Sequence, residues 1–301
     1  MSDTLEALRS KIGSADDLES VVRSMKSLAA ASIGQYERSV LALSDYARTV
    51  ELGLAVCLRQ QGREVAEAGE RTNSGTISAV VFGSDQGLVG QFNDVVTSFA
   101  AQALAALPGK KTVWAVGERA HARLADAGLA PVGLFPVPAS VGAITSLVGQ
   151  VLIETEARRA TEGTTPLYLF HNSPKAGSLY EPQSLRLLPL DHLWQQRLRR
   201  IRWPTAHLPE VLGDRKETLR TLVDEYLFVS LFRACAESLA SENASRLAAM
   251  QRAEKNIDDS LVGLHQTFNR QRQSSIDEEM FDVLAGFEAQ TGAGAQEGTV
   301  P

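Results

Sequence analysis

The residue types that most often carry catalysis or bind metals are scattered along this sequence of 301 residues. The histidines form no HExxH or HxxxH pair, Cys57 and Cys235 form no CxxC, and no GxSxG nucleophile elbow occurs. Asp85 could ligate a metal, but no second acid or histidine has a suitable spacing. The sequence therefore makes no positive case for catalysis or a metal site, and we expect no cofactor.

A glycine-rich turn, GSDQGLVGQFN, follows the apolar run TISAVVFG, at the place where an α/β fold would bind a nucleotide. Its glycines at 83, 87 and 90 are spaced four and three apart, which matches neither GxGxxG nor GxxxxGK[ST]. We interpret the stretch as a strand-to-helix turn that needs glycine dihedrals, with Asn93 or Asp94 near the helix cap. No bound nucleotide is expected.

The stretch FNRQRQSSIDEEMFD, residues 268–282, combines basic and acidic side chains with apolar ones. Its charges alone are typical of a solvated helix face. Its apolar residues nevertheless recur at helical spacing, at Ile276, Met280, Leu284 and Phe287. Such an aligned stripe favours contact with another protein, so a solvated face and a partner-binding face are the two alternatives.

Two long helices must position these residues. Positions taken at alternating steps of four and three residues are mostly apolar or aromatic. This holds for twelve of fourteen such positions from Leu8 to Leu54, and for twelve of fifteen from Leu219 to Phe268. A repeat averaging about 3.5 residues predicts a coiled-coil seam, and two seams of about 70 Å each predict one antiparallel pair. The seam pattern ends at Phe268, so roughly 20 further helical residues would project alone.

Between these helices, TISAVVFG, KKTVWAVG and TPLYLFHN are strand candidates that alternate with helical stretches at 91–107, 118–127 and 141–160. This alternation predicts a small parallel sheet, so the fold class is α/β, with a Rossmann-like domain inserted into a long antiparallel coiled coil. The expected divisions are an N-terminal helix at 1–60, a central domain at 75–203, a C-terminal helix at 207–288 and a disordered tail at 289–301.

Composition narrows the function classes. A formal net charge of -6 argues against a protein that coats nucleic acid, which needs a basic field. No apolar run approaches the roughly 18 to 20 residues that span a bilayer, and the N-terminus lacks the apolar centre of a signal peptide. We expect a soluble, cytosol-facing chain with two buried thiols.

Four stretches resemble the gamma subunit of F-type ATP synthases. LASENASRLAAMQRAEKNIDDSLVGLHQTFNRQRQSSIDEEMFDV is similar to that family's Ala-Ser-Glu, Arg, Met-x-x-Ala, Asn, then Asn-x-x-Arg-Gln-x-x-Ile-x-x-Glu. VVRSMKSLAAAS resembles Ile-Thr-Lys-Ala-Met-x-Met-Val-Ala-Ala, SDQGLVGQFN resembles Ser-Asp-Arg-Gly-Leu-Cys-Gly-x-Leu-Asn, and LRLLPL resembles a Leu-Leu-Pro-Leu strand end. The likeness covers both ends of the chain well and the centre weakly.

The resemblance implies a non-catalytic rotor stalk inside a hexamer of alternating alpha and beta subunits, coupling ion transport to ATP synthesis or hydrolysis. The globular end would meet the epsilon subunit and the c-ring, at the cytoplasmic face of the bacterial inner membrane. By the same resemblance, Arg246 and Gln273 match positions that contact the beta catch loops, with Arg272 and Glu279 beside them. Met25 matches the methionine near the beta lever region, and Asp85 falls in the lower globular part.

The chain also departs from the family pattern. Asp277 replaces the usual Thr, Gln86 the Arg and Val89 the Cys, which puts the details of the catch contacts at Asp277 in question. These departures suggest a divergent member, such as the alternative N-type F-ATPases. Without the resemblance, the seams would equally support a coiled-coil scaffold or tether with an α/β head, and a nucleotide-binding α/β enzyme with a helical hairpin is the third reading.

Overall fold

The computed structural model describes residues 4–60, 75–162, 165–176, 178–190, 192–207, 209–211 and 213–293. Its elements in chain order are α1 (Leu5–Gln60), β1 (Thr76–Phe82), α2 (Phe92–Ala105), β2 (Lys110–Val116), α3 (Glu118–Asp126), β3 (Gly133–Phe135), α4 (Val141–Glu162), β4 (Leu167–Lys175), β5 (Ser178–Leu188), α5 (His192–Arg199) and α6 (Arg215–Ala293). The chain divides into two units, one of residues 1–26 with 250–301 and one of residues 27–249. Both α1 and α6 contribute to each unit.

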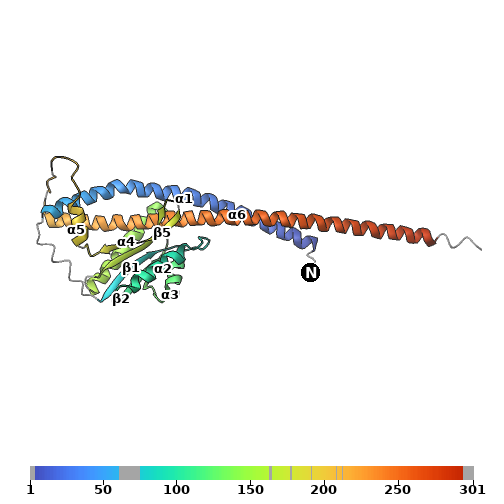
Figure 1. The fold of residues 1–301 in the computed structure, drawn as a ribbon, viewed down its shortest axis with the longest axis horizontal. Coiled ribbons are helices and arrows are strands. Elements are labelled where there is room, and N and C mark those ends of the chain that lie inside the picture. Colours follow the sequence, from blue (N-terminus) through green and yellow to red (C-terminus); the bar gives the residue numbers. More distant parts are fainter. Residues whose placement is uncertain are drawn as a thin grey trace, which may run out of the picture. The chain divides into compact units, whose positions relative to one another are not determined.

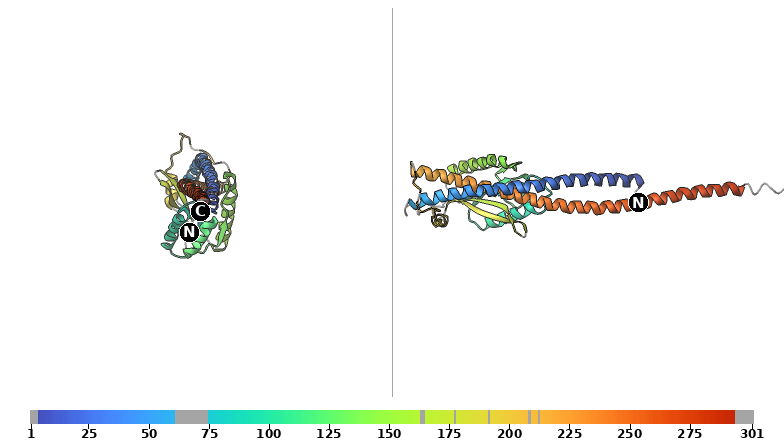
Figure 2. Two further views of the ribbon diagram at one scale, coloured as in Figure 1. Left: turned by 90° about the vertical axis from the view of Figure 1, so that its right-hand side faces the viewer. Right: turned by 90° about the horizontal axis from the view of Figure 1, so that it is seen from above.

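The helices α1 and α6 run side by side, as two views show (Figures 1 and 2). All fourteen seam positions predicted between Leu8 and Leu54 are buried or half-buried. Fourteen of the fifteen between Leu219 and Phe268 are too, and Arg233 is the exposed exception. The spacing of apolar residues therefore identified the faces that pack, and the predicted pairing of the two terminal helices is confirmed.

The start of α6 lies eight residues later than the expected position 207 because local turn chemistry intervenes. Gly213 has a positive φ of 91°, which a side chain would disfavour. The Asp214 carboxylate then accepts a hydrogen bond of 2.9 Å from the backbone N–H of Lys216, so it caps the first turn. The helix continues to Ala293, past the expected end at 288.

In the unit made by the N- and C-terminal segments, the two helices are antiparallel. The Lys26 Nζ lies 2.8 Å from Glu254 Oε1, and both are polar positions within the largely apolar seams. Near the other end of this unit, Leu5 at the start of α1 shares a surface hollow with Gln271 and Ser275 of α6. The Lys26 and Glu254 charges thus compensate each other across the seam and favour this register over a shifted one.

In the other unit, five strands form one sheet in the order β3-β2-β1-β4-β5. Strands β1 to β4 are parallel, with Val80 opposite Trp114 on one side and Leu169 on the other. Strand β5 is antiparallel to β4, with His171 opposite Gln183. The predicted parallel arrangement is confirmed for β1, β2 and β4, and the additional antiparallel strand β5 makes the inserted domain a mixed sheet.

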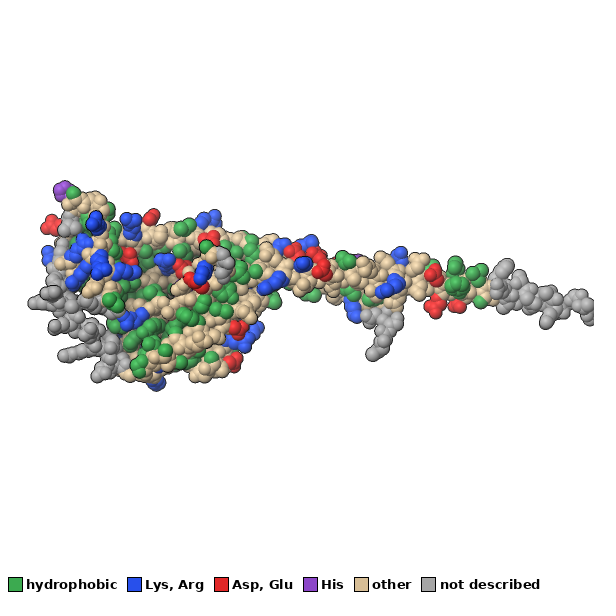
Figure 3. All heavy atoms as spheres, in the orientation of Figure 1, with side chains coloured by type: hydrophobic (Ala, Val, Ile, Leu, Met, Phe, Trp, Pro, Cys, Tyr) green, Lys and Arg blue, Asp and Glu red, His purple; other side chains and the backbone are tan. Residues whose placement is uncertain are grey.

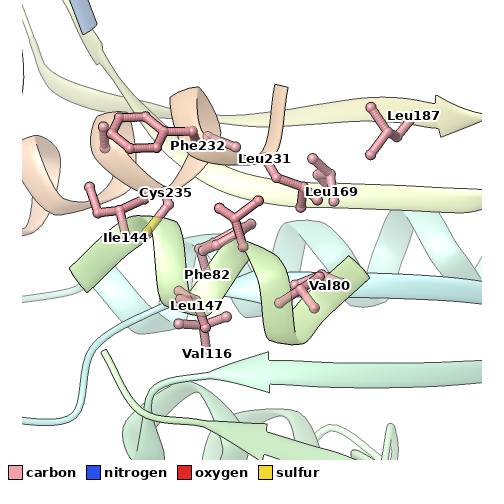
Figure 4. Close-up of a cluster of buried hydrophobic side chains, with 14 of the residues drawn as sticks. Val80, Phe82, Val116, Ile144, Leu147, Leu169, Leu187, Leu231, Phe232 and Cys235 are labelled. Atoms are coloured by element: carbon pink, nitrogen blue, oxygen red, sulfur yellow. The ribbon is translucent and has the colours of Figure 1, made fainter. Parts of the chain in front are cut away.

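Side chains alternate between the two faces of this sheet. Ile77, Ala79 and Val81 pack with residues of α2 and α3 in one buried cluster. Val80 and Phe82 belong to a second cluster, which includes residues of α4, α6 and α1, and Figure 4 draws part of it. Each fully buried large apolar side chain contributes about 1.5–3 kcal/mol. The second cluster therefore fixes the sheet against the helical pair of its own unit.

Part of the expected C-terminal tail, and one residue of the predicted apolar stripe, cannot be compared with the structure. The Phe287 side chain lies outside the described residues, as do residues 294–301 of the predicted disordered tail. Within the described ranges, no helix is long and apolar enough to cross a membrane.

Candidate functional site

The C-terminal part of α6 has an extended exposed surface. Every side chain from Ile276 to Gly286 is exposed, whereas Gln271 and Ser275 are half-buried beside the start of α1. The pairing surface therefore continues about two helical turns past Phe268, where the apolar pattern ends. It continues through polar side chains, which is why the apolar spacing could not detect it.

Apolar side chains form a stripe along this exposed part of α6. Ile276, Met280 and Leu284 are 52%, 53% and 51% exposed and recur every four residues. Phe281 and Val283 widen the stripe, and Figure 3 shows hydrophobic and acidic side chains together in this region. Large contiguous apolar surfaces of this kind on soluble proteins mark interaction sites. We call residues 276–284 the apolar stripe.

The polar residues predicted here surround that stripe. Arg272, Gln273, Asp277 and Glu279 are all exposed, and none forms an ion pair or side-chain hydrogen bond within the described chain. Their donors and acceptors are therefore available to another molecule. An apolar centre with arginine and carboxylates around it is the composition of a protein–protein interface.

The other predicted contact residues lie elsewhere. Met25 is half-buried on α1, in the same unit as Arg272, Gln273, Asp277 and Glu279. Arg246 and Asp85 belong to the unit that contains the sheet. The residues selected from the sequence thus form no single cluster, and those of the sheet-containing unit have internal partners.

Arg246 forms an ion pair inside the protein. Its guanidinium lies 2.7 Å from Glu242 Oε1, one helical turn earlier on α6, and only 14% and 6% of the two side chains are exposed. Burial raises the pKa of the Glu242 carboxyl, although the charge and hydrogen bond of Arg246 oppose the rise. Sequence reasoning missed Glu242, although its spacing of four residues from Arg246 is a recognisable ion-pair signal.

Asp85 also has an internal role. Its Oδ1 accepts a 3.0 Å hydrogen bond from the backbone N–H of Glu118, and its Oδ2 accepts one of 3.0 Å from that of Val137. One carboxylate therefore joins the loops that follow β1, β2 and β3. Metal binding at Asp85 gains no support, because the described residues contain no group of three potential metal ligands.

The glycine-rich turn is occupied by the protein's own side chains. Asn93 Oδ1 accepts a 3.0 Å hydrogen bond from the Ser84 backbone N–H, and Asn93 Nδ2 donates one of 2.8 Å to Ser84 Oγ. A Cβ on Gly83 would lie 2.4 Å from the Ala120 Cβ, so close helix packing requires this glycine. Packing therefore accounts for the glycine at position 83 of this turn.

Two more hydrogen bonds tie this turn to its surroundings. Ser245 Oγ on α6 donates to the Val89 carbonyl at 2.5 Å, and Asn172 Nδ2 on β4 donates to the Phe92 carbonyl at 2.9 Å. The turn thus links the sheet to α6. Ser245 lies 156 residues from its partner, so no local sequence signal could reveal it.

A hydrogen bond between His171 of β4 and Glu237 of α6, both largely buried, joins the sheet to the helix. His171 Nε2 lies 3.1 Å from Glu237 Oε2, and Arg233 Nε lies 2.7 Å from Glu237 Oε1. Burial alone would raise the pKa of the Glu237 carboxyl, but hydrogen bonds from His171 and Arg233 lower it to about 2. The carboxylate is therefore ionised at neutral pH and holds the sheet to the helix.

We expect Glu237→Gln to destabilise the chain by about 2 kcal/mol at pH 7, because a charged acceptor of two hydrogen bonds is lost. The pKa of Glu237 is lower in the folded chain than its ordinary value of 4.5. The ionised Glu237 carboxylate therefore stabilises the folded chain fully above about pH 4.5, and this stabilisation declines as the pH falls toward 2. The difference between wild type and variant should shrink by more than half at pH 3, measured by urea unfolding.

The matched control is Glu156→Gln on α4. The Glu156 side chain is 72% exposed and pairs with Arg159 on the surface, so its loss should cost less than about 1 kcal/mol. The assigned role of the buried carboxylate would be contradicted if both variants lost the same free energy of unfolding. It would also be contradicted if the loss caused by Glu237→Gln increased as the pH falls toward 3.

Comparison with known proteins gives a consistent family match. A family model described as ATP synthase matches residues 4–290. The chain is similar to the ATP synthase gamma chain of Anaeromyxobacter dehalogenans, with 25% identity over 95% of this chain and 99% of that protein. It is also similar to the ATP synthase gamma chain of a Cyanothece species, with 27% identity over 95% and 98% of the two chains.

Solved structures match most of the chain as well. A chain of the Euglena gracilis mitochondrial ATP synthase, in a structure of its OSCP, F1 and c-ring parts, has a TM-score of 0.63 at 18% identity and covers 98% of this chain. A chain of the Tetrahymena thermophila mitochondrial ATP synthase central stalk and c-ring has a TM-score of 0.56 at 19% identity and covers 77%. At these identities the likeness establishes the fold.

Proposed function

Because this chain belongs to the ATP synthase family, as the gamma subunit that forms the central stalk, we propose that it transmits torque between a membrane c-ring and the catalytic subunits. A gamma subunit is a non-catalytic rotor component, so its task is mechanical. It must be stiff along its length and must hold its partners firmly. The coiled coil of α1 and α6 supplies the stiffness, because each helix buries its apolar seam against the other.

The apolar stripe at residues 276–284 is the observation that carries this proposal. A single helix of about 20 residues is marginal in water, so a projecting helix with exposed apolar side chains is expected to be ordered by a surrounding partner. A ring of alpha and beta subunits would supply that apolar sleeve. The exposed Arg272, Gln273, Asp277 and Glu279 would then meet polar groups at its rim.

The proposed contacts differ in how much the geometry supports them. Gln273 and Arg272 are exposed and have no polar partner in the described chain, which supports contact with the beta catch loops. Glu279 and Asp277 lie beside them, and Asp277 is where this chain would bind differently from relatives with Thr. Met25 is half-buried on α1 and would approach the beta lever region only through its exposed part. Arg246 and Asp85 would act chiefly by holding their own unit together.

The remaining partners follow from the proposed role. The sheet-containing unit would meet the epsilon subunit and the c-ring, placing the chain peripherally at the cytoplasmic face of a bacterial plasma membrane. The departures at Gln86, Val89 and Asp277 support a divergent complex such as an N-type F-ATPase.

Replacing Arg272 or Gln273 by alanine is expected to lower coupled ion pumping several-fold while leaving the isolated chain folded. Both side chains are exposed, and surface substitutions of this kind change stability by less than about 0.5 kcal/mol. The measurement compares ATP-driven pumping and ATP hydrolysis in the reconstituted complex with circular dichroism of the isolated chain. Arg270→Ala, two residues earlier on an exposed position, is the control. Normal pumping in both variants would show that Arg272 and Gln273 do not contribute to the contact with the beta subunits.

Affinity purification from the native membrane tests the proposed function. A tagged chain should retain alpha, beta, epsilon and c subunits, and its deletion should prevent assembly of the ATPase. Purification of the chain as a homodimer without alpha and beta would contradict the rotor role and support a scaffold.

A further inference from the structure

A cavity of about 430 Å³ opens where strands β4 and β5 face the helices α1, α5 and α6. All of its lining residues belong to the unit that contains the sheet. Cavities of roughly 300–1,000 Å³ are the size that small molecules occupy. We call this space the polar cavity. Its polar lining includes Glu51, His171, Ser184, Arg197, Ser230 and Arg233.

The two arginines of the polar cavity have spare hydrogen-bond donors. Arg233 uses its Nε for Glu237 Oε1 at 2.7 Å, and its side chain is 64% exposed. Arg197 has only a long contact of 3.5 Å with Glu51, beyond the usual range of an N–H···O hydrogen bond. A guanidinium carries five N–H donors in a fork that matches a phosphate group. Both side chains can therefore still bind phosphate oxygens.

Hydroxyl groups around the polar cavity also lack partners. The side chains of Ser184 on β5 and of Tyr226 and Ser230 on α6 form no hydrogen bond within the described residues. Glu51 contacts Arg197 through Oε1, which leaves its Oε2 able to accept a hydrogen bond. A ligand hydroxyl can donate to a carboxylate and accept from a serine. The unused groups thus suit alcohols as well as an anion.

The buried carboxylate of the polar cavity does not oppose an anion. Glu237 accepts hydrogen bonds from both His171 and Arg233, so its acceptor atoms are engaged and its charge is compensated. Glu51 is the other acid of the lining, and Arg197 lies beside it. The capacity that remains in the cavity is therefore mainly that of donors.

The charge and shape of the polar cavity favour a small molecule over a partner protein. The buried centre of a protein–protein interface is depleted of charged residues. Here two arginines and two glutamates line one concave space, and the free donors come from β5, α5 and α6. A small ligand can reach donors on several walls of a cavity at once, and a few such polar groups are typical of ligand sites.

We propose that the polar cavity binds a phosphorylated polyol, such as a sugar phosphate. The guanidinium groups of Arg197 and Arg233 would hold the phosphate oxygens. The side chains of Ser184, Ser230 and Glu51 would meet the hydroxyl groups of the polyol. This site goes beyond the rotor role and does not depend on it. Because the ligand would touch three helices and the sheet, its binding would stabilise the folded chain.

Calorimetric titration of the purified full-length chain with glucose 6-phosphate, glucose and inorganic phosphate tests the proposal. Glucose 6-phosphate should bind at least about ten-fold more tightly than either of the others, because only it uses both sets of groups. Arg197→Gln should weaken its binding at least about ten-fold through loss of a charge-assisted hydrogen bond. Ser184→Trp should block the cavity from an exposed strand position that accepts aromatic residues.

The control is Arg200→Gln, an equal charge change at an exposed position outside the cavity lining, which should leave binding unchanged. Thermal unfolding without ligand should be the same for all three variants and the wild type, so that lost binding is not lost folding. A melting temperature that rises with glucose 6-phosphate only when Arg197 and Ser184 are intact would support the site independently.

The proposal would be overturned if the wild-type chain did not bind glucose 6-phosphate, or bound inorganic phosphate equally well. Unchanged binding in both Arg197→Gln and Ser184→Trp would also overturn it, because the ligand would then lie elsewhere. If the wild type bound no probe and Ser184→Trp released the epsilon subunit from the complex, the cavity would be part of a protein interface. Failure of the rotor role is distinguishable, since the wild-type chain would then not assemble with alpha and beta, whatever its behaviour in the titration.

Discussion

Replacing Leu261 by proline is expected to abolish ATP-driven ion pumping by the assembled complex. Leu261 is a half-buried seam residue within α6, a helix of 79 residues. Proline removes the backbone N–H of position 261, and its ring clashes with the carbonyl of Ile257, at a cost of about 3 kcal/mol or more. A break or kink there would let one part of the helix turn without the other, so hydrolysis would continue without pumping.

The control is Leu261→Ala, which keeps the helix and removes only part of one packed side chain. The Ala variant should retain pumping, and circular dichroism should show near-normal helix content in both variants. The decisive comparison is pumping per ATP hydrolysed in reconstituted vesicles. Coupled pumping by the Leu261→Pro complex at the wild-type ratio would show that torque does not pass through a stiff α6.

Replacing Arg246 by alanine is expected to destabilise the isolated chain by about 3 kcal/mol. The Glu242 carboxylate, in a residue only 5% exposed, would lose the guanidinium 2.7 Å away, and an unpaired buried charge is costly. Because burial raises the pKa of Glu242 above its ordinary value, the destabilisation should be larger at pH 8 than at pH 5. Urea unfolding at the two pH values measures this effect.

The double variant Arg246→Ala with Glu242→Gln should recover much of the lost stability, because no charge is then left buried. Arg246→Lys should lie between the wild type and Arg246→Ala. An Arg246→Ala chain that unfolds like the wild type at both pH values, yet assembles poorly with beta subunits, would mean that Arg246 serves only as a partner contact.

The sequence predicted the long helices and three of the five strands because these elements have strong local patterns. The seams of α1 and α6 repeat over many turns, and β1, β2 and β4 each contain a short, largely buried apolar run. Strand β3 has only three residues, too few to give a pattern. Strand β5 contains Pro182 and many polar residues, as an edge strand can, so its composition did not indicate a strand, and only the resemblance of LRLLPL to a strand end marked its last residues.

The candidate site was predictable only where it lies on regular helix. The exposed stripe at Ile276, Met280 and Leu284 follows from helical spacing and from the end of the seam. By contrast, the hydrogen bonds of Asp85 and the pairing of His171 with Glu237 join residues far apart in the chain. Such partners depend on the tertiary fold, so neither residue type nor local spacing could identify them.

Rotation of this chain inside an alpha and beta ring is the most direct test of its function as a rotor. Cys57 and Cys235 are 5% and 1% exposed, and burial raises the pKa of both thiols, so a cysteine introduced at the exposed Ala176 would be labelled selectively. A visible probe attached there, with the ring fixed to a surface, should turn continuously in one direction when ATP is added. A probe that stays still while the same complexes hydrolyse ATP at the full rate would contradict the account.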